Sequence, residues 1–100
     1  MTIDWKCPNQ SVDALKTLLE DALKSKGVPS FADFSWQGNE LFVRIDKAGK
    51  SEFRLALKQN GNDASIVEVK RDVAFLHKPF VTKVENYVGE IMSQIGARQS

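Results

Sequence analysis

The alternation of hydrophobic and polar residues predicts a short strand and then a helix near the start of the chain. In the first segment every second residue is apolar, which is typical of a half-buried strand: Ile3, Trp5 and Cys7. Pro8 ends this strand, and Ser11 is a good N-cap for the helix that follows. The apolar residues of that helix recur at helical spacing up to Gly27: Val12, Leu15, Leu18, Leu19, Ala22 and Leu23.

Four further alternating runs between Phe31 and Arg71 predict an antiparallel meander with one apolar face. Gly38-Asn39 has the form of a two-residue hairpin turn, and the partners it creates share that face: Trp36 with Leu41, and Phe34 with Val43. Odd-length loops around residues 48–50 and 61–63 predict the later pairs: Ile45 with Phe53, Val43 with Leu55, Leu41 with Leu57, Leu57 with Val67, and Leu55 with Val69.

The same register predicts two rows of charge on the open face of the sheet. One row holds Arg44, Arg54 and Lys70, and the next holds Asp46, Glu52 and Asp72. A solvated lattice of mixed charge is one interpretation of these rows. The alternative is that Arg44, Arg54 and Lys70 form a site for a protein partner or for an anion such as a carboxylate or phosphate.

A second, longer helix is predicted near the end of the chain. After Asp72, a candidate N-cap, the segment 73–78 can form one helical turn before Pro79, which suits the first position of a new helix. Apolar residues then recur at helical spacing up to Gly96: Phe80, Val84, Tyr87, Val88, Ile91 and Ile95. Residues 96–100 are expected to be a frayed tail.

These elements predict a single α+β domain over residues 1–100. The fold class is a two-layer sandwich with the order β-α-β-β-β-β-α, in which two helices cover one face of an antiparallel sheet of four to five strands. The pattern does not say which edge of the sheet the first strand joins.

Composition narrows the possible partners. The 100 residues are 42% hydrophobic and 27% charged, and the net charge of +1 gives no general attraction for nucleic acid. The open sheet face also offers only Phe42 for base stacking. No run approaches the roughly 18 consecutive apolar residues of a membrane span, and no secretory signal begins the chain. We therefore expect a cytoplasmic protein without nucleic-acid binding or a membrane span.

Metal and cofactor chemistry has little support in the sequence. The single cysteine, Cys7, has no partner for a disulfide within the chain and is expected to be a buried, inert thiol. His77 is the only histidine, so no cluster of metal-ligating residue types is present around it. We expect no metal, no cofactor and no catalytic residue.

Candidate binding residues surround the start of the second helix. His77 precedes Pro79 and is either a surface or cap histidine or part of an aromatic cluster. In the second interpretation four residues line the mouth of a groove between the long helix and the sheet, with Trp36 opposite: Phe75, His77, Phe80 and Tyr87. Such aromatic residues are more often simply core.

Gly89 interrupts the long helix at a cost of up to about 1 kcal/mol relative to alanine. Two interpretations remain open. The glycine allows either close approach of the helix to the sheet or room for a small ligand.

Two stretches carry a resemblance to a known family. They are Phe34-Ser-Trp-Gln-Gly-Asn-Glu-Leu-Phe and Lys78-Pro-Phe-Val-Thr-Lys-Val-Glu-Asn-Tyr-Val-Gly-Glu-Ile91. The chain resembles the small bacterial proteins encoded beside polyhydroxyalkanoate synthesis genes, in length, element order and these motifs. That resemblance implies an accessory or granule-associated role and supplies no catalytic residues. A more distant likeness is to helix-grip domains, in which a long C-terminal helix crosses a curved sheet and encloses a hydrophobic ligand.

Three hypotheses follow. The first is a non-enzymatic accessory module that binds a small apolar or acyl ligand, a polymer surface or a protein partner beside the terminal helix. The second is a structural protein-interaction module that uses the charged sheet face, as a monomer or weak homodimer. The third is an enzyme, for which His77 would need a buried carboxylate in space.

Overall fold

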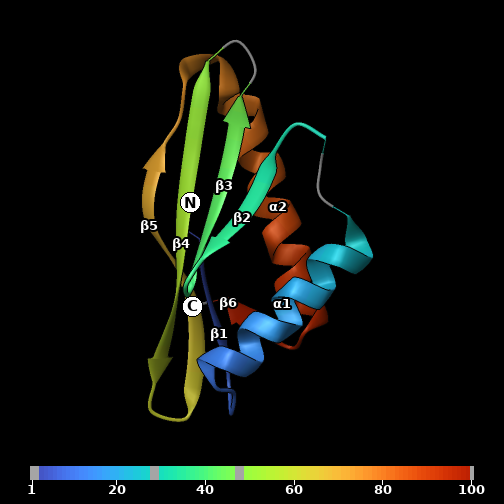
Figure 1. The fold of residues 1–100 in the computed structure, drawn as a ribbon, viewed down its shortest axis with the longest axis vertical. Coiled ribbons are helices and arrows are strands. Elements are labelled where there is room, and N and C mark those ends of the chain that lie inside the picture. The colour runs from blue at the N-terminus through green and yellow to red at the C-terminus, as the bar shows by residue number, and fades with distance from the viewer. Residues whose placement is uncertain (1–2, 28–29, 47–48, 100) are drawn as a thin grey trace.

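A six-stranded antiparallel sheet carries two helices on one face, which confirms the predicted α+β sandwich with one strand more than expected (Figure 1). The computed structural model describes residues 3–27, 30–46 and 49–99. Its elements are β1 (Asp4–Cys7), α1 (Val12–Lys26), β2 (Asp33–Gln37), β3 (Glu40–Asp46), β4 (Lys50–Asn60), β5 (Asp63–Asp72), the short 3₁₀ turn η1 (Phe75–His77), α2 (Lys78–Gln94) and β6 (Arg98–Gln99). The strand order is β2-β3-β4-β5-β1-β6.

β1 lies between β5 and β6 in the sheet. The first strand therefore joins the meander beside its last strand, a position that the sequence pattern left open. β1 pairs antiparallel with β5, from Asp4 opposite Val67 to Cys7 opposite Ala64. On its other side β1 pairs with β6, where Trp5 lies opposite Gln99. The prediction of a frayed tail was therefore wrong for Arg98 and Gln99, and Ser100 lies outside the described residues.

The turn that closes α2 explains this difference. Gly96 takes a φ of 85°, which favours glycine, and its N–H donates to the Ser93 carbonyl over 3.2 Å. The N–H of Ala97 donates to the Met92 carbonyl over 2.9 Å. This pair of hydrogen bonds is a Schellman motif, which reverses the chain and delivers β6 to β1.

The first hairpin has the predicted register, and the second does not. Trp36 lies opposite Leu41 and Phe34 opposite Val43, as expected. Between β3 and β4 the predicted pairs are wrong by two residues: Ile45 lies opposite Ser51, Val43 opposite Phe53, and Leu41 opposite Leu55. The last pair of this hairpin is Asp46 with Lys50, whereas the predicted register places Asp46 opposite Glu52. A two-residue slip preserves which side chains face the core.

A turn shorter than predicted and a β-bulge together set the pairing of β4 with β5. Asn60 pairs with Asp63, so the turn has two residues, and Leu57 lies opposite Ile66 instead of Val67. The same register places Leu55 opposite Glu68 rather than the predicted Val69, and a bulge between Arg54 and Leu55 then restores the predicted pairing of Arg54 with Lys70. Val69 is 46% exposed, whereas Glu68 and Arg71 lie on the face that the helices cover.

The charged rows of the open face are consequently rearranged. Arg54 does lie opposite Lys70 and Glu52 opposite Asp72, as predicted. Arg44, however, lies opposite Glu52 instead of Arg54, because of the two-residue slip. The predicted row of three cations is therefore wrong, and so is the row of three acids, since Asp46 pairs with Lys50.

Both helices begin and end close to the predicted residues. The Ser11 hydroxyl accepts from the Ala14 N–H over 3.1 Å, and Gly27 closes α1 with a φ of 83°. Pro79 occupies the first turn of α2. Asp72 caps no helix, because it is the last residue of β5, and a 3₁₀ turn precedes α2 instead.

The core lies between the helices and the inner face of the sheet. Its fully buried side chains include Leu15 of α1, Val84 and Met92 of α2, and Phe53, Leu55 and Ile66 of the sheet. Among the residues that the structure describes, no helix is long and apolar enough to cross a membrane.

Cys7 provides a test of this core. It is 2% exposed, and burial, followed by the Asp63 carboxylate, raises the pKa of its thiol. The raised pKa adds to the free energy of unfolding. This contribution is complete below the thiol pKa of the unfolded chain, about 8.5, and is lost as the pH rises through the higher thiol pKa of the folded protein. Between about pH 7 and about pH 10 the urea unfolding free energy should therefore fall more steeply for the wild type than for Cys7→Ala. Equal slopes would contradict this placement of the thiol.

Candidate functional site

The five residues predicted to line one groove lie in different places. Phe75 projects from η1 and is 78% exposed, whereas His77 is buried in the same turn. Phe80 stacks on Phe31, with ring centroids 5.0 Å apart, and contacts His77 edge-on. Tyr87 is buried, and Trp36 lies between β2 and α1.

Tyr87 and Trp36 have separate surroundings. The Tyr87 hydroxyl donates to the Gly27 carbonyl, and its ring meets Phe34 edge-on at 5.4 Å. Burial raises the pKa of the Tyr87 phenol, an effect that nearby Lys26 partly offsets. Trp36 lines a small groove of about 270 Å³ between β2 and α1. Its indole lies under the ammonium group of Lys16, at 5.2 Å from the ring centroid.

His77 has a hydroxyl partner that the sequence did not reveal. Ser51 Oγ lies 2.6 Å from His77 Nδ1 and also accepts from the Ala74 N–H over 2.8 Å. Both side chains are buried, with His77 at 1% exposure. Because Ser51 is 26 residues away in the sequence, only the pairing of β4 brings it to η1. The contact fixes the turn to the end of the sheet, and a substrate cannot reach the imidazole in this structure.

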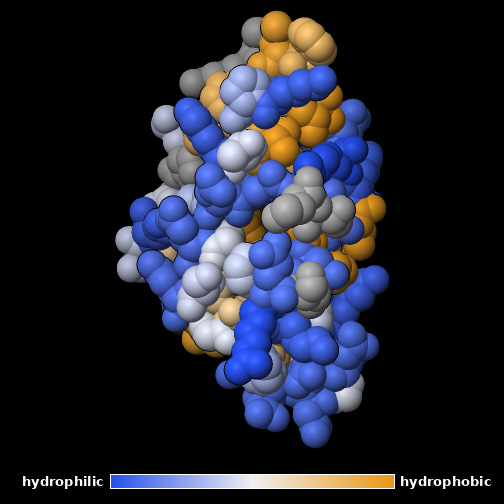
Figure 2. Space-filling model, turned by 180° about the vertical axis from the view of Figure 1, so that it is seen from behind, coloured by the Kyte–Doolittle hydropathy of each residue, from blue (hydrophilic) through white to orange (hydrophobic). Residues whose placement is uncertain are grey.

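Phe75 and Leu76 form an exposed apolar tip at the end of the molecule where η1 lies. They are 78% and 65% exposed, and we refer to the pair as the tip. Figure 2 shows hydrophobic side chains gathered at the upper end of the molecule, above a mostly polar surface. The Lys78 ammonium group lies 5.0 Å from the centroid of the Phe75 ring. The tip is therefore an aromatic and an aliphatic side chain held out from a fixed turn.

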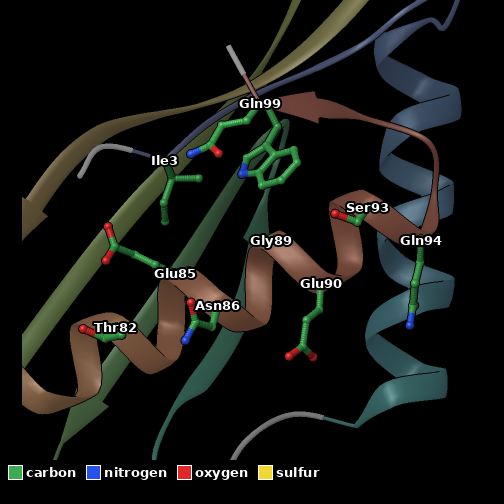
Figure 3. A pocket seen from close by; sticks show the side chains of 10 residues that line it. Ile3, Thr82, Glu85, Asn86, Gly89, Glu90, Ser93, Gln94 and Gln99 are labelled. Carbon is green, nitrogen blue, oxygen red and sulfur yellow. The ribbon is translucent and has the colours of Figure 1, made fainter.

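A second candidate site is a groove beside α2, at the sheet edge formed by β1 and β6. It has a volume of about 780 Å³ and combines an indole, one aliphatic residue and polar groups of α2 and β6: Ile3, Trp5, Thr82, Glu85, Asn86, Gly89, Glu90, Ser93, Gln94 and Gln99. Figure 3 shows that Glu85 and Ser93 rise from the side of α2 nearer Ile3 and Gln99. We call this site the α2 groove.

Gly89 permits close approach of α2 to the sheet, which is the first of the two interpretations that the sequence left open, and room for a ligand stays a prediction. A Cβ at this position would lie 3.3 Å from Cζ2 of Trp5, so the glycine permits close contact between the helix and the indole. The same residue lines the α2 groove. Sequence reasoning placed Trp5 on a strand but missed its role here, because the position of β1 was unknown.

A partly buried ion network lies beside this groove and shares Glu85 with it. Arg71 Nη2 lies 2.7 Å from Glu68 Oε1 and 3.2 Å from Glu85 Oε2. Burial alone would lower the pKa of Arg71, but its hydrogen bonds to the two carboxylates raise it, so the guanidinium stays charged. Glu68 Oε1 also accepts from the Ile3 N–H over 3.3 Å. One cation thus joins β5, α2 and the start of β1.

The predicted anion residues on the open face have acidic neighbours. Arg44 Nε lies 3.4 Å from Glu52 Oε2, and Arg54 Nε lies 3.7 Å from Glu40 Oε1. Both guanidinium groups lie over the Phe42 ring. Arg44 and Lys70 line one groove of about 390 Å³ together with Asp46, Glu52 and Asp72. An anion or partner site on this face stays a prediction.

Within residues 3–27, 30–46 and 49–99, no three metal-ligating side chains come together as a metal site would require. Comparisons of the chain with protein-family models, with curated proteins and with solved structures found no match.

The Ser51 contact can be tested through stability. Ser51→Ala removes one hydrogen-bond partner of a buried imidazole and the side-chain acceptor of the Ala74 N–H, so we expect a loss of about 2 kcal/mol in unfolding free energy. Urea denaturation measures the change, and hydrogen exchange at Ala74 and His77 should accelerate. Ser35→Ala, on the exposed face of β2, is the matched control and should have little effect. Equal effects of the two substitutions would contradict the anchoring role of Ser51.

Proposed function

We propose that the protein is a non-enzymatic accessory module that attaches to an apolar surface through the tip. The observation that supports this function is the 78% exposure of Phe75 next to the 65% exposure of Leu76. Burying such side chains stabilises a complex by about 1.5–3 kcal/mol each when the burial is complete. Two of them side by side suit weak, reversible attachment, which many copies on one particle would strengthen.

The fixed turn beneath the tip favours binding. Ala74 and His77 are hydrogen-bonded to Ser51, and the His77 N–H donates to the Ala74 carbonyl over 2.9 Å. A side chain on a preorganised turn loses less conformational entropy on binding than one on a flexible loop. The tip is therefore exposed, although hydrogen bonds hold the turn that carries it in place.

The charges near the tip indicate an apolar rather than an ionic surface. Exposed Lys78 adjoins the tip, and exposed Lys50 and Lys70 share a groove with Asp46 and Asp72. Cations and anions are thus mixed, and the whole chain has a net charge of only +1. The resemblance to proteins encoded beside polyhydroxyalkanoate synthesis genes supports a polyester granule in the cytoplasm as the surface that the tip contacts. The non-enzymatic assignment is supported by the burial of His77 against a serine hydroxyl.

Co-sedimentation with poly-3-hydroxybutyrate particles tests this function. The double variant Phe75→Ser, Leu76→Ser should lower the bound fraction, with an apparent affinity at least about tenfold weaker. Its stability should change little, because both side chains are already exposed. Added salt should not weaken binding by the wild type, because the contact is apolar.

Val69→Ser is the matched control, since it removes another exposed aliphatic side chain outside the tip. Its binding should equal that of the wild type. Equal binding by wild type and double variant, or binding lost only at high salt, would contradict the proposal. Absence of wild-type binding to both polyester particles and phosphatidylcholine-coated oil droplets would also contradict it.

A further inference from the structure

The α2 groove lies on a part of the surface that the tip does not use, and its composition points to a ligand. We propose that the α2 groove binds a neutral saccharide, which stacks on the indole of Trp5 and hydrogen-bonds to the surrounding polar side chains. A sugar ring has one apolar C–H face and a rim of hydroxyl groups, so it requires a flat apolar floor and several donors and acceptors. The groove offers both within one cavity of about 780 Å³.

The floor of the groove is set by Trp5. Its indole is half-buried and is held against α2 by contact with Gly89, where a Cβ would come within 3.3 Å of Cζ2. Ile3 is buried beside it on the same face of β1. A side chain at position 89 would crowd the six-membered ring of this indole, so the glycine leaves the ring in place. Trp5 is thus a fixed aromatic platform with a polar tip.

The polar groups come from both walls of the groove. Gln99 lies opposite Trp5 in the β1–β6 pair, so the carboxamide adjoins the indole on the same face of the sheet. Ser93 and Glu85 lie on the side of α2 nearer Ile3 and Gln99 in Figure 3. Within the part of the chain that the structure describes, the side chains of Gln99, Ser93 and Asn86 make no hydrogen bond to the protein. Their donors and acceptors are therefore available to sugar hydroxyls.

The charges of the groove favour an uncharged ligand over a cation. Its acidic side chains are Glu85 and Glu90, and each already has a cationic partner. Glu85 is paired with Arg71 at 3.2 Å, and Glu90 with Lys26 of α1 at 2.6 Å. The paired cations neutralise the charge of the two carboxylates, so little negative charge remains to attract a cationic ligand. A single indole also falls short of the aromatic cage that binds quaternary ammonium groups.

NMR of the ¹⁵N-labelled full chain tests this site with maltotriose, cellotriose and N,N′,N″-triacetylchitotriose at millimolar concentrations, followed by an array of neutral glycans. We expect at least one neutral saccharide to shift the indole N–H signal of Trp5 and the side-chain amide signal of Gln99. The indole signal of Trp36, which lines a different groove, should not move. This internal control separates binding in the α2 groove from a general effect of the sugar.

Substitutions of exposed residues locate the contacts with little effect on the fold. Gln99→Ala and Ser93→Ala change exposed residues, and each should weaken the apparent affinity by roughly tenfold or less, as loss of one hydrogen bond implies. Gln37→Ala, an exposed carboxamide on β2, is the matched control and should leave the affinity unchanged. Trp5→Leu should abolish binding, and the amide spectrum shows whether this variant is folded.

Two results would overturn the proposal. One is that no neutral glycan moves the Trp5 signal, in solution or on the array. The other is that tryptamine or choline moves this signal whereas the saccharides do not, which would assign the groove to a cation. The assay for the tip is unaffected by either result, because Phe75 and Leu76 do not line the α2 groove.

Discussion

The positions of α2 and β1 depend on the contact between Arg71 and two glutamates beneath α2. Arg71 reaches Glu68 on its own strand and Glu85 on the helix, and its guanidinium lies 5.0 Å from the centroid of the Phe53 ring. A half-buried cation is tolerated because both carboxylates pair with it. The bulge in β5 makes this contact possible, since an uninterrupted ladder would place Lys70 rather than Arg71 opposite Phe53. A local irregularity thereby sets the position of α2 over the sheet.

The sequence predicted the elements far better than their pairing. Ser11, Gly27, Pro79 and Gly96 act at helix ends as their chemistry requires, and Gly38-Asn39 sets the first hairpin. The later registers failed because turn length depends on which residues close the loop, and alternation is unchanged by a two-residue slip. The Ser51–His77 contact joins residues 26 apart, so no local pattern indicates it. The α2 groove was hidden for a similar reason: Trp5 and Gly89 meet only once β1 is placed beside β5.

The two proposed binding surfaces differ in chemistry and use different parts of the same frame. The tip is apolar, is fixed by hydrogen bonds to Ser51 and lies where β5 leads into α2. The α2 groove has a polar rim and lies along α2 beside β1 and β6 (Figure 3). Both depend on α2, because its first turn follows the tip and its exposed side forms one wall of the groove. One helix can therefore present an attachment point and a ligand site without a second domain.

The position of β1 also has a consequence for the order in which the chain folds. Its partners are β5, about sixty positions later, and β6 near the other end of the chain, whereas the strands from β2 to β5 pair with their immediate neighbours. The meander closes short loops, so it pays a smaller entropic penalty and is expected to form first. Until β1 arrives, the edge of β5 is an open ladder of backbone donors and acceptors, which is the kind of edge through which chains aggregate. The four residues of β1 thus protect the partly folded chain as well as completing the sheet.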